Sequence, residues 1–416
     1  MARPRFVIAA LLMAAGLSAC ASPLASQQID QAATAVAGTL SALSGASPAA
    51  PPLASPSPIA SPAPTQPPAP TPVPGALPQP LYYLNKDADG RMQVFRLAQD
   101  GRTVQQITFE PADVDDLDLS PVDGSLAYVS NNQLLLVDGN GAGRRILLDG
   151  GGRDANSPFV NQVSSPAWSP DGRTLAFGYN GLNFYSLDSG NIQKALEDRL
   201  DDSAGFAIPR ELYTPGPYAP DGSRLLVRIG FYEGETFGVY RPADNSLVRF
   251  TRSDGAMICC ELRWTPDGGG LYAASASIGT VDSGLLYLDA ASGEARILLP
   301  GSAPDGTFNF AAGPQVGRDG KLYFFFNNLP QIPVTSHTPL YLVRSDTDGA
   351  TGRARLKQEA FDSINEVLWA PDAGLAVVVG GPGDAVAAGG AARVVYPDER
   401  PDLALLDFAE DVHWGK

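Results

Sequence analysis

The sequence predicts an all-β protein, and three observations support this. A motif of the form Trp-Ser-Pro-Asp-Gly recurs along the chain, and all four tryptophans occupy the same position in it. Short apolar runs alternate with turns rich in glycine and proline, as expected of many short strands. The copies follow one another at intervals of about 45 to 53 residues, a range typical of propeller blades and solenoid turns. Together these features predict a β-propeller.

The motif itself has a structural explanation. Its clearest copy spans Pro166–Phe177. Pro-Asp-Gly forms a tight turn because proline restricts φ, aspartate bonds to nearby backbone and glycine accepts a positive φ. The aromatic residue before the turn ends the first strand of a blade, where it can pack between neighbouring blades. The seven copies centre on Leu119, Trp168, Tyr218, Trp264, Val316, Trp369 and Trp414.

Residues 1–19 form a predicted lipoprotein signal peptide. Arg3 and Arg5 precede an apolar run that is shorter than a typical membrane span. The segment Leu17–Cys20 resembles the lipobox of bacterial lipoproteins, in which the chain is cut before the cysteine and the cysteine carries the lipid anchor. The resemblance implies lipidation of Cys20 and attachment to a membrane outside the cytoplasm. The alternative is an ordinary signal peptide cut at an Ala-x-Ala-like site.

Residues 20–80 form a predicted stalk between the lipid anchor and the folded domain. The segment is rich in alanine, serine and threonine and then in proline, as in Pro64–Pro72. Such a composition cannot bury a core, so it predicts a disordered, extended linker. The linker is either a spacer that holds the domain away from the membrane or a tether with no required length.

Residues 81–416 form the predicted propeller domain. Leu81–Leu84 is its first strand, which corresponds to the second strand of a blade whose first strand is missing. Asp411–Trp414 supplies a first strand with nothing after it. Pairing the two closes the ring and leaves no free sheet edge between its ends. The prediction is therefore seven blades, with the C-terminal strand completing the first. The alternative is six blades with an irregular extension.

The repeat resembles that of TolB-type, WD40-like β-propellers. The segments Pro166–Phe177 and Gln105–Thr108 carry the resemblance, which covers the whole globular part. TolB propellers have six blades, and TolB is a soluble periplasmic protein with an additional N-terminal domain. This chain has seven motifs, a predicted lipid anchor and a stalk, so the resemblance does not transfer TolB's own partners.

Charge and cysteine content narrow the possible partners. The net charge of -16 excludes nucleic-acid binding, which needs a basic face, and favours cations or basic partners. With Cys20 assigned to the lipid, Cys259 and Cys260 remain and are adjacent. In an oxidising compartment they either form a disulfide with each other or stay as reduced, separately buried thiols.

Signatures of catalysis are absent from the sequence. It contains no His-Glu-x-x-His, Gly-x-Ser-x-Gly or P-loop motif, which favours a protein that is not an enzyme. No cofactor is predicted, with calcium as the alternative. Asn85, Asp87 and Asp89 place oxygen atoms at alternate positions, as at the start of a calcium loop. Arg96 stands where the final acidic ligand would be, so an ordinary hairpin turn is the competing interpretation.

The long connections predict a binding face. The strands of each blade are named A to D in chain order, and the D–A and B–C connections of a propeller leave the same face of the ring. Several of these connections are long here, and loops on a rigid scaffold commonly carry function. Aromatic and arginine side chains are typical interface anchors. The candidate ligand-binding residues are Phe159, Tyr179, Phe206, Arg210, Tyr213, Tyr232, Glu233 and His337.

These observations predict a membrane-anchored, extracytoplasmic propeller of the cell envelope that acts as a protein-binding or scaffolding module. Its expected partner is another cell-envelope protein. One alternative is a propeller that binds a carbohydrate or peptide. Another is a lyase or hydrolase that uses carboxylates near the central channel, for which Glu211, Glu233 and Glu235 are the candidates.

Overall fold

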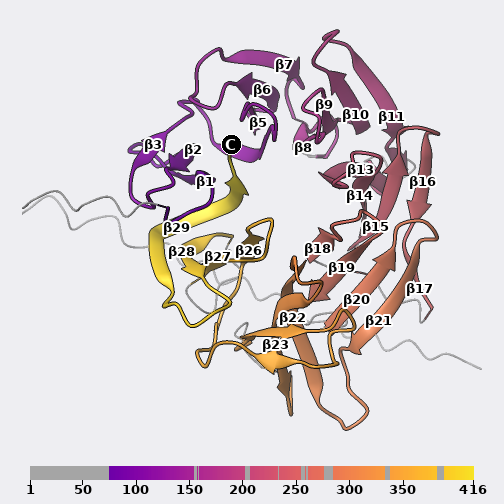
Figure 1. The fold of residues 1–416 in the computed structure, drawn as a ribbon. Coiled ribbons are helices and arrows are strands. Elements are labelled where there is room, and N and C mark those ends of the chain that lie inside the picture. Colours follow the sequence, from indigo (N-terminus) through magenta and orange to yellow (C-terminus); the bar gives the residue numbers. More distant parts are fainter. Residues whose placement is uncertain are drawn as a thin grey trace, which may run out of the picture. The chain divides into compact units, whose positions relative to one another are not determined.

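The computed structural model describes residues 75–153, 157, 159–201, 207–232, 234–253, 258, 261–275, 284–332, 338–381 and 388–416. The predicted signal peptide, Cys20 and nearly all of the predicted stalk lie outside these residues. Within them every regular element is a β-strand, and no helix is long and apolar enough to cross a membrane. The strands form seven blades (Figure 1), so the predictions of an all-β fold and of a propeller are confirmed.

Blades 2, 3 and 6 are four-stranded antiparallel sheets in which neighbouring strands are consecutive in the chain. Blade 2 consists of β4 (Val114–Leu119), β5 (Leu126–Ser130), β6 (Gln133–Val137) and β7 (Arg145–Asp149). Blade 3 consists of β8 (Ser164–Trp168), β9 (Thr174–Gly178), β10 (Gly181–Ser186) and β11 (Ile192–Glu197). Blade 6 consists of β22 (Phe308–Val316), β23 (Leu322–Leu329), β24 (Tyr341–Ser345) and β25 (Ala354–Arg355).

Blades 4 and 5 each carry one additional short strand. Blade 4 consists of β13 (Ile208–Tyr218), β14 (Leu225–Phe231), β15 (Gly234–Arg241) and β16 (Ser246–Arg249), with β12 (Arg199–Asp201) paired to the start of β13. Blade 5 consists of β18 (Glu261–Trp264), β19 (Gly270–Ser275), β20 (Gly284–Asp289) and β21 (Glu294–Pro300). The strand β17 (Thr251–Arg252) runs parallel to β21 and covers the outer edge of blade 5.

Blades 7 and 1 share one strand, and this strand closes the ring. Blade 7 contains β26 (Glu366–Trp369), β27 (Ala376–Gly380) and β28 (Gly390–Val395), and blade 1 contains β1 (Leu81–Lys86), β2 (Met92–Leu97) and β3 (Val104–Gln106). The last strand, β29 (Leu403–Trp414), pairs with β28 through its first half and with β1 through its second half. The predicted closure, with the C-terminal strand completing the first of seven blades, is confirmed.

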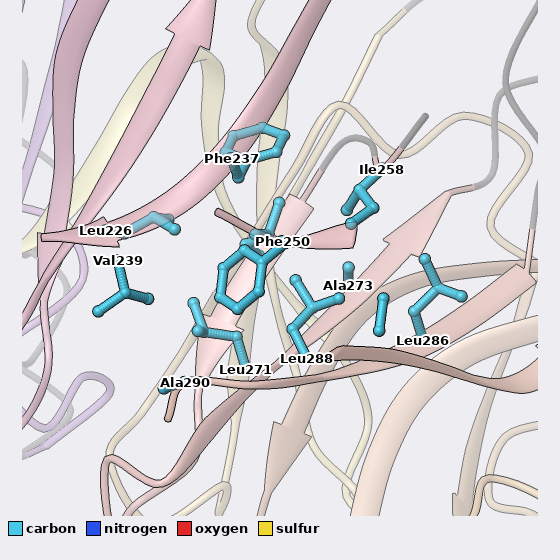
Figure 2. Close-up of a cluster of buried hydrophobic side chains, with 12 residues drawn as sticks. Leu226, Phe237, Val239, Phe250, Ile258, Leu271, Ala273, Leu286, Leu288 and Ala290 are labelled. Atoms are coloured by element: carbon cyan, nitrogen blue, oxygen red, sulfur yellow. The ribbon is translucent and has the colours of Figure 1, made fainter. Parts of the chain in front are cut away.

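The core consists of seven clusters of buried side chains among the described residues, one at each junction between adjacent blades. The junction of blades 4 and 5 shows the pattern: Phe237 and Phe250 pack against Leu271 and Leu288 (Figure 2). Successive residues of an inner strand enter different clusters, because side chains alternate between the two faces of a strand. Tyr128 packs toward blade 1, whereas Val129 packs toward blade 3. Both faces of a blade are therefore buried.

The repeated motif residues tie neighbouring blades together. The indole Nε1 of Trp369 donates to the backbone carbonyl of Gly313 in blade 6 (2.7 Å), and that of Trp414 donates to the carbonyl of Trp369 in blade 7 (2.8 Å). The motif aspartate holds its own turn, as expected: the Asp267 carboxylate accepts hydrogen bonds from the Thr265 hydroxyl and the Gly269 amide. The motif thus combines a tight turn with a contact between blades.

The segment before Leu81 also belongs to the folded unit. Leu77 is buried in the cluster between blades 7 and 1, and its amide donates to the carbonyl of Gln99 (3.0 Å). The chain therefore contacts the ring before its first strand begins.

We expect that only glycine fits at position 313 in β22, because of its backbone conformation and its close neighbours. Its φ is 58°, and an added Cβ would lie 2.8 Å from side-chain atoms of Val367 in the next blade. Gly320, in the turn that follows β22, also has a positive φ (69°) but open space around it. We expect Gly320→Ala to reduce the free energy of unfolding by about 1 kcal/mol, from backbone strain alone. Gly313→Ala should cost about 2 to 4 kcal/mol, because overpacking adds to the strain. Urea denaturation of both variants would measure the difference, and equal losses would contradict this account of the blade junction.

Candidate functional site

The A strands of the blades surround a central channel with a cavity of about 890 Å³. Its lining comes from blades 1 to 5 and blade 7, and it includes the residues one and three positions before the motif residue of these blades. The residues between these two positions, such as Leu117, Leu262 and Val367, belong to the apolar clusters between blades. The intervening residues also border the cavity, but most polar groups of the A strands that line it stand at the two alternate positions.

One side of the channel is strongly acidic. At the position three residues before the motif residue, blades 7, 1 and 2 carry Glu366, Asp411 and Asp116. Asp115, Asp118 and Glu410 come from the same group of blades and also line the cavity. These six residues, Asp115, Asp116, Asp118, Glu366, Glu410 and Asp411, are called the acidic wall. The acidic wall lines the central cavity.

Several channel carboxylates bind the backbone of the next blade. Asp116 accepts a hydrogen bond from the amide of Ser165 (2.8 Å), and Glu261 accepts one from the amide of Gly313 (2.7 Å). Glu366 accepts two, from the amides of Asp411 (2.8 Å) and Val412 (3.0 Å).

The three amides that lie three residues before a motif residue share an unusual backbone. Ser165, Gly313 and Asp411 have φ values of 51°, 58° and 52°, and each lies where the register of its A strand shifts. A β-bulge leaves an amide outside the ladder, and the carboxylate of the preceding blade satisfies it. The carboxylates therefore have a structural task.

His413 is the cationic partner within the acidic wall. Its Nε2 lies 2.8 Å from Asp411 Oδ1, and its Nδ1 lies 3.6 Å from Asp118 Oδ1. Burial disfavours the charged imidazole, but the carboxylates of Asp411 and Asp118 outweigh burial and hold the pKa of His413 well above its ordinary value. His413 therefore places a positive charge beside the carboxylates where the closing strand meets blade 2.

Burial raises the pKa of three carboxyl groups in the same wall. Asp116 is affected most, because burial and the nearby charge of Asp411 raise its pKa to about 7. Burial also raises the pKa of Glu366, although the two amide hydrogen bonds oppose the shift. Burial and the nearby charge of Asp411 raise the pKa of Glu410. These groups are harder to ionise than ordinary carboxyls because they are partly removed from water and, secondarily, because the charge of Asp411 is close to them.

The opposite side of the channel carries arginines. Arg263 pairs with Glu261 in its own blade (3.2 Å) and donates to the backbone carbonyl of Val367 in blade 7. Arg228 pairs with Glu235 (3.3 Å). The channel therefore has arginines paired with glutamates at blades 4 and 5 and an excess of carboxylates at blades 7, 1 and 2.

The geometry limits what this channel can do chemically. Four of its carboxylates, Asp116, Asp118, Glu261 and Glu366, each accept a backbone amide of another blade. A general acid or base has to reach a substrate proton, and these groups are engaged with the protein itself. Of the enzyme candidates considered earlier, Glu211 pairs with Arg249 (2.9 Å) and Glu235 with Arg228, and neither lines the cavity. Glu233 lies outside the described residues.

The residues predicted for a ligand-binding face occupy different environments. Tyr232 is 70% exposed, whereas Phe159 and Tyr179 are half-buried. Arg210 is exposed and pairs with Asp201. Tyr213 is only 4% exposed, packs between blades 3 and 4, and donates its hydroxyl proton to Glu211. Phe206, Glu233 and His337, and the pair Cys259 and Cys260, lie outside the described residues. A ligand-binding role for these residues stays a prediction.

The proposed calcium-loop residues form a hairpin turn between β1 and β2. One oxygen of Asp87 accepts the amides of Asp89 (2.8 Å) and Arg91 (2.9 Å), and the Arg91 guanidinium contacts both aspartates. Asn85 donates its side-chain amide to the carbonyl of Phe408. Among the described residues, no group of three or more His, Cys, Asp or Glu side chains is arranged to hold a metal ion. Calcium binding at this turn stays a prediction.

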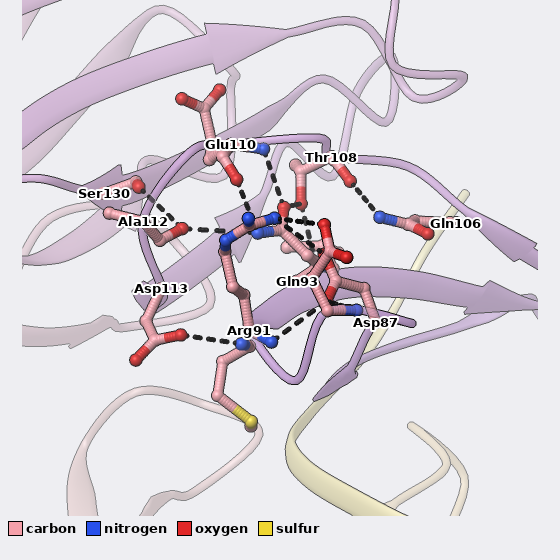
Figure 3. A network of polar contacts seen from close by, with 12 residues as sticks. Asp87, Arg91, Gln93, Gln106, Thr108, Glu110, Ala112, Asp113 and Ser130 are labelled. Carbon is pink, nitrogen blue, oxygen red and sulfur yellow. Dashed lines mark hydrogen bonds and ion pairs between the residues drawn. The ribbon is translucent and has the colours of Figure 1, made fainter. Parts of the chain in front are cut away.

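Among the described residues, the most exposed aromatic side chain was not one of the candidates. Phe109, in the connection from β3 to β4, is 77% exposed. Its neighbours Thr108 and Glu110 are held by the buried Gln93, whose amide contacts the Thr108 hydroxyl, both backbone groups of Glu110 and the carbonyl of Ala112 (Figure 3).

The Glu110 side chain is anchored as well. Arg144 binds it through two nitrogen atoms (2.7 and 2.9 Å), and the Tyr128 hydroxyl donates to it (2.7 Å). The hydrogen bonds from Arg144 lower the pKa of Glu110 despite its burial. Phe109 thus projects from a connection whose backbone is fixed on both sides.

One feature of the site could have been found by aligning the seven motif copies. Such an alignment places Asp116, Glu261, Glu366 and Asp411 at one position, three residues before the motif residue. No comparable signal marks Phe109, because its exposure depends on how the connection folds over blade 1.

Comparison with known proteins supports the fold and not a family. No protein-family model and no curated protein matches the sequence. Among solved structures, TolB from Acinetobacter baumannii is 14% identical over 80% of this chain and 82% of its own, with a TM-score of 0.40. A puromycin-hydrolyzing peptidase from Mycobacterium tuberculosis is 15% identical over 80% of this chain and 52% of its own, with a TM-score of 0.53. An oligogalacturonate lyase from Vibrio parahaemolyticus is 13% identical over 59% of this chain and 83% of its own, with a TM-score of 0.33. At these identities the likenesses concern the fold alone.

Glu366 should stabilise the closing strand through its two amide hydrogen bonds. We expect Glu366→Ala to reduce the free energy of unfolding by about 2 kcal/mol, because it leaves two backbone amides without an acceptor. The Glu366→Gln variant retains one acceptor oxygen, so its free energy of unfolding should lie between those of the Ala variant and the wild type. Chemical denaturation would measure these values, with the exposed Glu294→Ala in blade 5 as the control. If the Ala and Gln variants were equally stable, the hydrogen bonds would have no measurable role.

Proposed function

We propose that this protein is a membrane-anchored, extracytoplasmic β-propeller that binds another protein of the cell envelope through its loop face. The ring is the rigid scaffold, and the D–A and B–C connections present the contacting side chains. The net charge of -16 favours a partner with a basic surface.

The observation that carries this proposal is the fixed presentation of Phe109. An aromatic ring that is 77% exposed costs free energy in water unless a partner covers it. The buried Gln93 network holds the backbone on both sides of this ring, so little conformational entropy is lost when a partner binds. Tyr232, 70% exposed in the B–C turn of blade 4, leaves the same face by topology. Exposed aromatics on a preformed surface are typical interface anchors.

Binding is favoured over catalysis by the use of the channel carboxylates. Asp116, Glu261 and Glu366 accept amides of neighbouring blades. A lyase or hydrolase at the channel would have to free these groups from the backbone. A carbohydrate or peptide ligand is the second candidate, because exposed aromatic rings also stack on such ligands.

The location follows from the N-terminal sequence. A lipid on Cys20 would attach the chain to a membrane, and residues 20–80 would connect the anchor to the ring. We infer an extracytoplasmic location from the lipobox-like segment Leu17–Cys20 and from the resemblance of the repeat to TolB-type propellers.

Co-purification from gently solubilised native envelopes tests the proposal. The full-length protein is compared with a Phe109→Ala/Tyr232→Ala double variant. The control is Val122→Ala/Ile192→Ala, which truncates exposed apolar side chains on the opposite turns and the outer rim. Recovery of the partner should fall at least tenfold in the first variant, because truncation of an aromatic anchor commonly costs 2 kcal/mol or more.

The outcomes separate the alternatives. Unchanged recovery of a partner in the double variant would contradict the assignment of the loop face. If no protein is recovered with the wild type, the carbohydrate- or peptide-binding alternative and the enzyme alternative gain support. Equal melting temperatures of the three proteins would show that a loss of binding is not a loss of folding.

A further inference from the structure

The closing strand, defined as Glu410–Trp414, has few means of attachment. It pairs with β1 at Leu81, Tyr82 and Leu84, and its register is interrupted opposite Tyr83. Beyond this ladder, the indole of Trp414 donates to the Trp369 carbonyl and the Gly415 amide donates to the Pro80 carbonyl (2.7 Å). Glu366 of blade 7 also accepts the amides of Asp411 and Val412. Because this strand alone completes blade 1, closure of the ring depends on this short ladder and these few hydrogen bonds.

Ionisable groups gather around the same strand from every side. The strand itself carries Glu410, Asp411 and His413; β4 of blade 2 contributes Asp115, Asp116 and Asp118, and β26 of blade 7 contributes Glu366. On β1, the Tyr82 hydroxyl is engaged with the Gly139 carbonyl, and on β28 Arg393 pairs with Glu359. Beyond the strand, Lys416 donates to the Val122 carbonyl. Arg263, across the channel, pairs with Glu261.

Positive charge in this cluster is scarce. In the described part of the chain, His413 is the cationic side chain that pairs with Asp411 and Asp118, and Arg153 pairs with Asp115 (3.2 Å). Asp116 and Glu366 have backbone amides as partners, which stabilise a carboxylate without neutralising it. Full ionisation therefore places six negative charges against one imidazolium and one arginine.

We infer that the closure of the ring is a proton-dependent latch, which is tight at mildly acidic pH and loosens as the pH rises through neutrality. The inference does not depend on the proposed partner. At mildly acidic pH, protonation of Asp116 removes its repulsion with Asp411. His413 is then charged and attracts the remaining carboxylates. At higher pH that proton is lost, and the added negative charge opposes the pairing of the closing strand with blades 7 and 2.

The sign of the effect follows from linkage. Asp116, Glu366 and Glu410 have pKa values above those of an unfolded chain, so the folded state binds protons more tightly. Their contribution to stability therefore decreases as the pH rises from about 4 to about 7, the window set by Asp116. The pKa of His413 is also raised, so its contribution is present below its ordinary pKa and is lost only as the pH rises through the higher folded value. The two kinds of group act in the same direction.

Hydrogen exchange of the full chain at pH 5.5 and pH 8.0 tests the latch. Mass spectrometry would follow a peptide that covers the closing strand, with rates corrected for intrinsic exchange, and a peptide that covers β22 as an internal reference. We expect protection of the closing strand to be about tenfold lower at pH 8.0, the effect of roughly one pKa unit of linkage, with β22 unchanged.

Two variants and one control make the test specific. Asp116→Asn keeps an acceptor for the Ser165 amide but cannot ionise, so the pH effect should shrink to less than about threefold. His413→Gln removes the cation and should lower protection at both pH values. Glu294→Gln, on the outer strand of blade 5, should retain the full pH effect. The inference would be overturned if wild-type protection were equal at the two pH values, if Asp116→Asn kept the full effect, or if all blades lost protection together.

Discussion

Burial of both faces of every blade is the constraint on which this structure depends. Alternate residues of the inner strands enter different clusters, as Tyr128 and Val129 do on either side of blade 2. A single blade would therefore expose a large apolar surface, and an open row of blades would expose one at each end. A closed ring covers all of these faces without capping elements. Closure of the ring depends on β29, because this one strand serves as the outer strand of blade 7 and the inner strand of blade 1.

The carboxylates in the channel follow from the geometry of the inner strands. A bulge in an A strand leaves an amide without a partner in the ladder, and an acidic residue of the preceding blade accepts its hydrogen. This arrangement satisfies the backbone but brings like charges together where blades 7, 1 and 2 meet. Burial is the main reason that the pKa values of Asp116 and Glu366 are raised, the charge of Asp411 adds to the shift, and His413 offsets part of it. Polar groups that stabilise three junctions thus weaken one of them, which is the junction where the chain ends.

The loop face has a different physical character from the channel. There, a buried polar network holds the connection from β3 to β4 (Figure 3), and this connection carries the exposed ring of Phe109. A binding surface benefits from a rigid backbone and an exposed side chain, because little conformational entropy is then lost when a partner binds. The channel offers charge but few free groups, which is why the proposed function is placed on the loops.

The sequence by itself determined the blades and their turns. Pro-Asp-Gly forms the same turn wherever it occurs, and the strand Asp411–Trp414 had no partner other than Leu81–Leu84, so local chemistry and strand counting were sufficient. The predicted signal peptide and Cys20 also rest on sequence alone. Only the tertiary structure decided which acidic residues meet, because Asp116, Glu366 and Asp411 are far apart in the chain and become neighbours when the ring closes. It likewise decided that Tyr213 is buried while Phe109 is exposed. A side chain's environment depends on the blade that packs against it, and no local pattern specifies that neighbour.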